Sequence, residues 1–327
     1  MLLRFFRSTT TQMIIMIPLM GILLWLHSIL KTPVVYFLFD RTPMPLYKFV
    51  TDLLPPTSGK ATIFTLALVI IQGYWLVRLN TRFLFINTRT YMPAILFVLL
   101  CTCIPDLQRL NPVIFSGFFL LLAIEKIFES YRTAKLAYQY FVAAFYISIG
   151  SLFYPYVSFF MFFIWAGLAV LKPFNWREWV FTFTGFLAPI FFTFSFYYLV
   201  YNDPLRLYHD YKAAFSIGFY FSNYHVSTII FLGTLALLIL IASQFMIRTF
   251  QSMKILPRKA FTIIFWLFVN TLAVYILIRQ ASVEMIFLAA IPVSYLLTNY
   301  FTFMKARLWG NFFLILLIGL IIWIQMA

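Results

Sequence analysis

Two acid–base pairs lie in polar stretches of this 327-residue chain, and both contain groups that can carry chemistry. Asp40 is followed directly by Arg41, and Asp106 comes three residues before Arg109. A carboxylate can act as a general base or hold a metal ion against a phosphate, and arginine binds phosphate oxygens. The structural alternatives are a solvated turn for the first pair, and a helix cap with a local ion pair for the second. We predict Asp40 and Asp106 as catalytic residues and both arginines as substrate-binding residues.

A third group of polar residues follows a long apolar run. The letters NDP at 202–204 predict a helix start, with Asp203 as the N-cap and proline at the first helical position. Helical spacing then places Asp203, Arg206 and Asp210 near one face, with His209 beside them. We predict all four as substrate-binding residues, because arginine matches phosphate oxygens in a bidentate manner. A capped surface helix with an Arg206–Asp210 pair is an equally consistent interpretation.

Arg279 closes another apolar run and shares a tight turn with Glu284. Its guanidinium can reach an anionic headgroup or a lipid phosphate, so we include it among the substrate-binding residues, and snorkelling to the interface is its default alternative. The sequence has no Gly-rich phosphate loop, no nucleophile elbow and no metal-ligand cluster at fixed spacing. No cofactor is evident, and a divalent metal held by carboxylates is the one option that the pattern leaves open.

The elements that carry these residues must be membrane helices. Hydrophobic residues make up 64% of the chain, aromatic residues 21% and charged residues only 10%, which leaves too little polar surface for a water-soluble domain. The net charge of +15 comes from basic residues scattered singly or in small groups between apolar runs. This scatter is typical of topology-setting loops and argues against nucleic-acid binding.

Hydropathy predicts an all-α, polytopic integral membrane bundle of about eleven transmembrane helices. With the N-terminus inside and the C-terminus outside, sixteen of the 24 Lys and Arg residues fall inside and eight outside, which follows the positive-inside rule. Every aspartate then falls on the outer side. The predicted spans are 11–30, 61–77, 91–104, 112–124, 137–152, 155–171, 179–200, 226–247, 261–278, 285–303 and 309–326.

We treat residues 1–327 as one transmembrane domain with two structured outer loops. The loop at 31–60 has an apolar pattern at helical spacing, which predicts a short amphipathic helix in the membrane interface that is stopped by two prolines. The second outer loop covers 201–225. On the inner side, a charged helix end is predicted to hold paired charges without chemistry. The apolar residues of the interfacial helix are Leu46, Phe49, Val50, Leu53 and Leu54, and the inner charges are Glu125, Lys126, Glu129 and Arg132.

This layout resembles the GT-C superfamily of membrane glycosyltransferases. Those proteins have an inside N-terminus, a first outer loop with an acid and interface helices, and a second acid in the next outer loop. The resemblance implies transfer of sugar from a polyprenyl-phosphate donor on the outer face, with Asp40 as the first-loop acid, Asp106 as the second, and Arg279 at the donor phosphate. The chain departs from the family in lacking a D-x-D motif and a large C-terminal outer domain. It also resembles an uncharacterised family of Bacteroidota inner-membrane proteins.

Three hypotheses of function follow. The leading one is a GT-C-like glycosyltransferase that acts at the periplasmic face and binds membrane lipids and a polyprenyl-phosphate sugar donor. The second is a transporter or flippase of a lipid-linked substrate. The third is a non-catalytic membrane subunit of an envelope assembly, whose protein partners the sequence does not identify. All three place the chain in the inner (plasma) membrane as a multi-pass protein.

Overall fold

A computed structural model describes residues 6, 12–31, 37–131, 136–171, 175–203, 205–216, 225–278, 280–304 and 307–326. These residues are all-α, and no strand occurs among them. The principal helices are α2 (Gln12–Leu30), α3 (Leu38–Arg41), α4 (Pro45–Leu53), α5 (Gly59–Phe83), α6 (Met92–Cys101), α7 (Pro112–Ser130), α8 (Leu136–Ser151), α9 (Met161–Leu171), α10 (Trp176–Tyr201), α11 (Arg206–Ser216), α12 (Val226–Thr249), α13 (Ile255–Leu277), α14 (Ile286–Phe303) and α15 (Arg307–Met326). The short 3-10 helices are η1 (Pro105–Leu107), η2 (Pro155–Phe160), η3 (Phe250–Ser252) and η4 (Val283–Met285).

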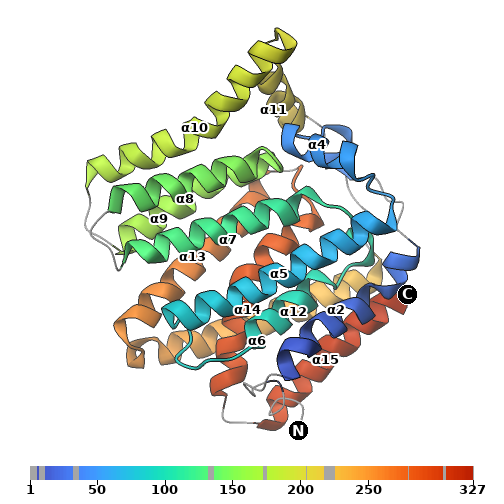
Figure 1. Cartoon of the computed structure of the whole chain (residues 1–327). Coiled ribbons are helices and arrows are strands. Elements are labelled where there is room, and N and C mark those ends of the chain that lie inside the picture. Colours follow the sequence, from blue (N-terminus) through green and yellow to red (C-terminus); the bar gives the residue numbers. More distant parts are fainter. Residues whose placement is uncertain are drawn as a thin grey trace.

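The long helices lie alongside one another in one bundle, with α14 and α6 inside it (Figure 1). Every residue of α6 is buried, and so is most of α14, whose polar side chains Ser294 and Thr298 donate to carbonyls of their own helix. The outer helices leave many large apolar side chains exposed, among them Phe191 and Phe192 of α10 at 65% each. Such a surface is stable in lipid and unfavourable in water. The chain is therefore a helical membrane protein.

The predicted count of eleven spans is higher than the structure supports. Each predicted window contains a helix, but only seven helices among the described residues are long and apolar enough to cross a membrane. The spans that meet this requirement are α2, α5, α10, α12, α13, α14 and α15. The four remaining windows hold α6 with 10 residues, α8 with 16, η2 continued by α9, and α7, which ends in a charged turn. Apolar runs inside the bundle need not reach both surfaces, and hydropathy does not distinguish the two cases.

Two short helices lie together at one end of the bundle, which we call the α4 end (Figure 1). Leu46 of α4 packs into a cluster with Leu207 and Tyr211 of α11, and its N–H donates to the carbonyl of Leu152 at 3.2 Å. The Tyr211 and Ser151 hydroxyls are 2.8 Å apart. The two predicted outer loops therefore pack on each other and on the turn after α8.

The predicted amphipathic helix forms as α4, but its apolar face is divided. Val50 and Leu54 pack against the buried cluster around Tyr47, whereas Phe49 and Leu53 are 70% and 74% exposed. Residues four apart share a helix face, so two stripes exist where the sequence analysis predicted one. One stripe packs on the protein, and the other is free to enter the membrane interface.

Candidate functional site

The α4 end contains a buried ion pair between two residues that the sequence analysis assigned to different pairs. Arg109 Nη2 lies 2.6 Å from Asp40 Oδ1, and the two side chains are only 6% and 14% exposed. Asp40 was predicted to act beside Arg41, and Arg109 beside Asp106. The fold instead joins the acid of the first loop to the base of the second. At low exposure this charged hydrogen bond is strong, because little water competes for either partner.

Short local elements hold Asp40 in place. The one-turn helix α3 directs its carboxylate back to the chain, where Asp40 Oδ2 accepts from the Phe37 N–H at 3.0 Å. The rings of Phe37 and Phe39 are stacked with centroids 5.2 Å apart, and the Arg109 guanidinium lies 5.8 Å from each centroid. These cation–π contacts supplement the ion pair. The aromatic residues therefore fix both partners and keep water away.

The loop that carries Arg109 is tied to distant helices. Gln108 donates through Nε2 to the Thr102 carbonyl at 2.9 Å and accepts from the Ser28 hydroxyl of α2 at 2.7 Å. Gln325 of α15 donates to the same carbonyl at 3.1 Å. On the other side, Asn111 caps α7 by accepting from the Val113 N–H at 2.9 Å. Arg109 therefore belongs to a loop that is anchored by hydrogen bonds from α2 and α15.

Burial raises the pKa of two acidic side chains in this group, Asp40 and Tyr47. Loss of solvent raises the pKa of Asp40 above its ordinary value of 3.8, although the nearby Arg109 charge acts in the opposite direction. Burial also raises the pKa of Tyr47, and the charge of Asp40 adds to that rise. The Tyr47 hydroxyl donates to the Leu110 carbonyl at 3.1 Å. Arg109, Asp40 and Tyr47 thus form one coupled group.

The other predicted residues of the first two loops lie apart from this group. Asp106 is exposed in η1, directly before the buried stretch 107–110, and Arg41 is exposed at the end of α3. The structure therefore does not place Asp40 and Asp106, the two predicted catalytic acids, around a shared arginine. Arg279 lies outside the described residues.

The residues around α11 form a second polar group. Arg206 lies over the rings of Tyr197 and Tyr201, at 5.3 and 4.5 Å, and the Tyr197 hydroxyl donates to Asp210 Oδ2 at 3.4 Å. Burial raises the pKa of Asp210, while the charges of Arg206 and Lys48 act against it. Lys48 belongs to α4, so this helix lies between the two polar groups.

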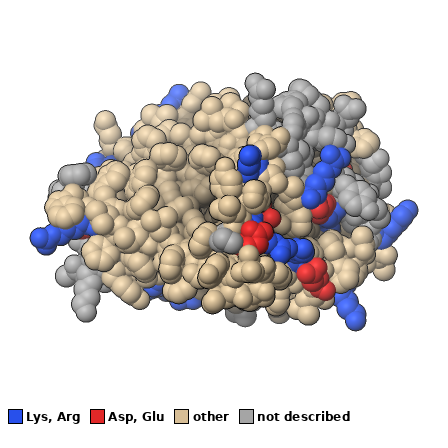
Figure 2. Space-filling view, turned by 90° about the horizontal axis from the view of Figure 1, so that it is seen from above, with Lys and Arg blue, Asp and Glu red and all other residues tan. Residues whose placement is uncertain are grey.

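Asp203 and His209 have structural or peripheral positions in this group. The Leu205 N–H donates to Asp203 Oδ1 at 3.2 Å, so Asp203 fixes the chain just before α11, which begins at Arg206 rather than at residue 204. His209 is exposed beside Tyr208. Seen from above, acidic and basic side chains lie next to one another on this face, and much of the remaining surface is uncharged (Figure 2).

A buried carboxylate that the sequence analysis named in a turn but did not assign to the site lies in η4, directly before α14. Glu284 is 1% exposed, accepts from the Tyr154 hydroxyl at 3.0 Å and from the Ser282 N–H at 3.2 Å, and is also bonded to the Ser282 hydroxyl. Nearby, Gln280 donates to the Phe215 carbonyl of α11 at 3.0 Å. The signal in the sequence was an acidic residue directly before an apolar run, since a charge within a membrane is costly unless it is paired or hydrogen-bonded.

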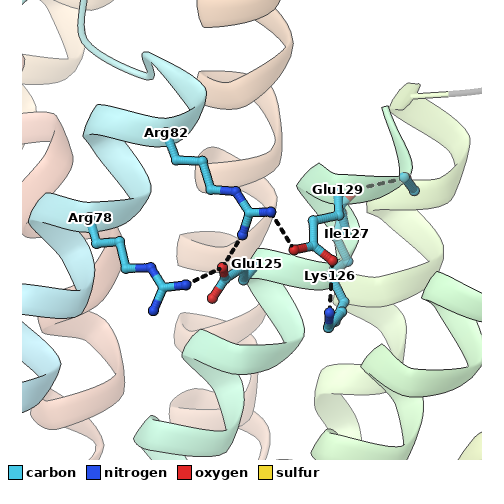
Figure 3. A network of polar contacts seen from close by, with 7 residues as sticks. Arg78, Arg82, Glu125, Lys126, Ile127 and Glu129 are labelled. Atoms are coloured by element: carbon cyan, nitrogen blue, oxygen red, sulfur yellow. Dashed lines mark hydrogen bonds and ion pairs between the residues drawn. The ribbon is translucent and has the colours of Figure 1, made fainter. Parts of the chain in front are cut away.

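The predicted inner charges form a larger network than expected. Arg82 of α5 bonds to both Glu125 and Glu129 of α7, the latter at 2.8 Å, and Arg78 lies 3.5 Å from Glu125 (Figure 3). Lys126 pairs with Glu129 at 2.7 Å. The predicted local pairing is confirmed, and the two arginines add a link between helices. Arg132 lies outside the described residues. We assign this network a structural role.

A metal site is not apparent in the part of the chain that the structure describes, where no three His, Cys, Asp or Glu side chains come together to hold an ion. Metal dependence therefore stays an untested option. The carboxylate of Asp40 has Arg109 as its cationic partner.

The chain belongs to a family of unknown function (DUF6427), whose sequence profile matches residues 57–327. Arg109, Glu125 and Glu284 lie within the matched region, and Asp40 precedes it. No curated protein and no solved structure matches the chain.

Proposed function

We propose that this protein is a membrane transferase that acts on a lipid-linked sugar, with its site at the α4 end of the bundle. We further propose that this end faces the periplasm, that the N-terminus lies inside and the C-terminus outside, and that the host membrane is the inner membrane. The observation that carries the proposal is the Asp40–Arg109 pair, since the first loop's acid and the second loop's base share one site. The excess of Lys and Arg on the opposite side supports the orientation.

In this proposal Arg109 binds the phosphate of the donor, and Asp40 serves the acceptor. When the donor phosphate pairs with the Arg109 guanidinium, the ion pair between Arg109 and Asp40 weakens. The Asp40 carboxylate is then free to take the proton of an acceptor hydroxyl. The acceptor oxygen forms a bond to the anomeric carbon, and the bond from that carbon to the phosphate oxygen breaks. The electron pair leaves with the phosphate, whose charge Arg109 neutralises. Arg206 supplies a second cation on the same face.

A second candidate function is a membrane subunit of an envelope assembly. The observation in its favour is α10, whose 26 residues rise about 39 Å, more than the roughly 30 Å hydrocarbon core. Its aromatic side chains are widely exposed, including Phe196 at 54% and Tyr198 at 56%. If the protein is such a subunit and a partner covers α10, the Asp40–Arg109 pair has only a structural role.

The experiment is a transfer assay on the full chain in proteoliposomes. Polyprenyl-phosphate sugar donors with labelled sugars are supplied with membrane extracts as the source of acceptors, and labelled products are counted. Label transferred by the wild type above empty liposomes supports the enzyme. Absence of transfer from every donor, together with capture of a stoichiometric protein partner through α10, would support the subunit.

A further inference from the structure

A pocket lies between the ends of α12 and α14, at the end of the bundle opposite the α4 end. The segment before α14 lies beside α11, where Gln280 donates to the Phe215 carbonyl, and α14 runs from there to Phe303. The pocket has a volume of about 560 Å³, within the range of roughly 300–1,000 Å³ that small-molecule sites have. Its lining includes Asn87 of the loop between α5 and α6, Phe245 and Thr249 of α12, Ser252 of η3, and Tyr300 and Phe303 of α14.

The pocket lies at the level where two membrane spans end. These spans end at Ser252 and Phe303, and both residues line the pocket. The lining from Phe245 to Ser252 rises about 12 Å, and the headgroup region on each side of a bilayer is roughly 5–8 Å deep. A ligand in this pocket therefore meets polar headgroups and water on one side and hydrocarbon on the other.

The tyrosine of this pocket has a hydroxyl without a protein partner. Tyr300 is only 5% exposed, and its ring packs against the ring of Phe245 with centroids 5.6 Å apart. None of the described residues forms a hydrogen bond with its hydroxyl. Because buried polar groups in proteins are nearly always hydrogen-bonded, the partner of this hydroxyl must come from outside the chain.

The polar groups of the lining suit an anion. No acidic residue lines the pocket in the part of the chain that the structure describes. The Thr249 hydroxyl donates to the Phe245 carbonyl at 3.0 Å, and the Ser252 hydroxyl donates to the Thr249 carbonyl at 2.7 Å, so both protons are already used. The donors left for a ligand are the Tyr300 hydroxyl and the side-chain amide of Asn87.

Arg248 supplies a positive charge on the same face of α12. It comes three residues after Phe245 and four before Ser252, and residues at these spacings share a helix face. Its side chain is exposed and takes part in none of the ion pairs among the described residues. Lys254, next to the lining residue Met253, adds to the positive field. Arginine with hydroxyl and amide donors is a typical set of ligands for a phosphate group.

We propose that this pocket binds a phosphate ester, whose phosphate lies between the Arg248 guanidinium and the Tyr300 hydroxyl. The body of the ester packs against the rings of Phe245 and Phe303. Two sources offer this chemistry, the headgroup of an anionic phospholipid and a phosphate ester dissolved in water. The site is separate from the Asp40–Arg109 pair and does not depend on the proposed transferase.

The test counts ligands bound to the full chain by native mass spectrometry from dodecyl maltoside micelles, which contain no phosphate. The phosphate probes are phosphatidylglycerol and adenosine monophosphate. The control probes are diacylglycerol and adenosine, which have the same bodies without the phosphate. The wild type should bind one molecule of a phosphate probe in a saturable manner, and the matching control probe should bind at least about tenfold more weakly.

Two variants remove the phosphate ligands, and two matched variants serve as controls. Arg248→Gln and Tyr300→Phe should each weaken binding of the phosphate probe about tenfold. Arg258→Gln removes an exposed charge in the first turn of α13, at the same end of the bundle, from a residue that does not line the pocket. Tyr138→Phe removes the hydroxyl of an exposed tyrosine of α8. Both controls should bind like the wild type.

The probes separate the two sources, and three results would overturn the proposal. Binding of phosphatidylglycerol alone assigns the site to a lipid headgroup, and binding of adenosine monophosphate alone assigns it to a water-soluble ester. Binding of both in competition shows a site that recognises the phosphate itself. The proposal fails if neither phosphate probe binds, or if the control probes bind equally well. It also fails if Arg258→Gln weakens binding as much as Arg248→Gln, because the general positive charge of this end would then explain the attraction.

Discussion

Asp40 and Arg109 are 69 positions apart in the sequence, and their side chains meet at 2.6 Å in a largely buried ion pair. The pair connects α3, in the first loop, to the loop between α6 and α7. It therefore fixes the loops at the α4 end to each other and to the bundle.

Loss of one partner should be more harmful than loss of both. Arg109→Met leaves the Asp40 carboxylate buried without its counter-ion, and we expect a loss of about 3–5 kcal/mol in the free energy of unfolding. Replacing both partners, by Asp40→Leu with Arg109→Met, should restore more than half of that loss. Unfolding in detergent micelles, followed by tryptophan fluorescence, measures the three variants. Additive losses in the double variant would show that the two side chains do not interact.

The same carboxyl should give stability a pH dependence of known sign. Since burial raises the pKa of Asp40 above 3.8, the folded chain holds this proton more tightly than the unfolded chain does. This contribution to stability is present below pH 3.8 and is lost as the pH rises through the folded pKa. In melting curves recorded from pH 3.5 upward, the wild type should lose stability as Asp40 ionises. Asp40→Asn should lack this loss. Identical pH profiles for the two proteins would contradict the raised pKa.

At the opposite end, Glu125 should matter more than Lys126. Glu125 is 7% exposed and faces both Arg78 and Arg82, so Glu125→Gln should cost roughly 1–3 kcal/mol, with the part-exposed arginines partly solvated. Lys126→Gln removes a pair within one helix and should cost less than about 0.5 kcal/mol. Both values come from the same micelle unfolding experiment. Equal losses would mean that the link between α5 and α7 adds nothing to the local pair.

The packing of α10 on α8 depends on Gly185. A Cβ at this position would collide with the Phe141 carbonyl oxygen, which is backbone and cannot move alone. Gly185→Ala should therefore destabilise the protein by about 1–3 kcal/mol. Gly233→Ala meets open space and should stabilise α12 by about 0.5–1 kcal/mol, because alanine is the better helix former. The two melting temperatures should thus move in opposite directions, and a shift in the same direction would reject the close approach.

The class of this protein was predictable from composition, and the partners in its site were not. Apolar runs identify helices wherever they occur, so every predicted window contains one. Ion pairs that join distant segments have no local signature, which is why Asp40 was assigned to Arg41 and Arg109 to Asp106. Glu284 was named in the turn with Arg279 but not assigned to the site, and its partner Tyr154 lies 130 positions away. The division of the apolar face of α4 into two stripes was not predictable either, because it depends on which residues pack beneath the helix.

The central claim is that the Asp40–Arg109 pair is a site of transfer and not only a structural link. Its most direct test is the initial rate of sugar transfer from a polyprenyl-phosphate donor in proteoliposomes, at equal amounts of folded protein. Asp40→Asn should lower the rate about 100-fold or more, as loss of a general base does. Asp52→Asn, which removes an exposed acid of α4, should stay within about twofold of the wild type. Equal rates for wild type, Asp40→Asn and Asp52→Asn would contradict the claim.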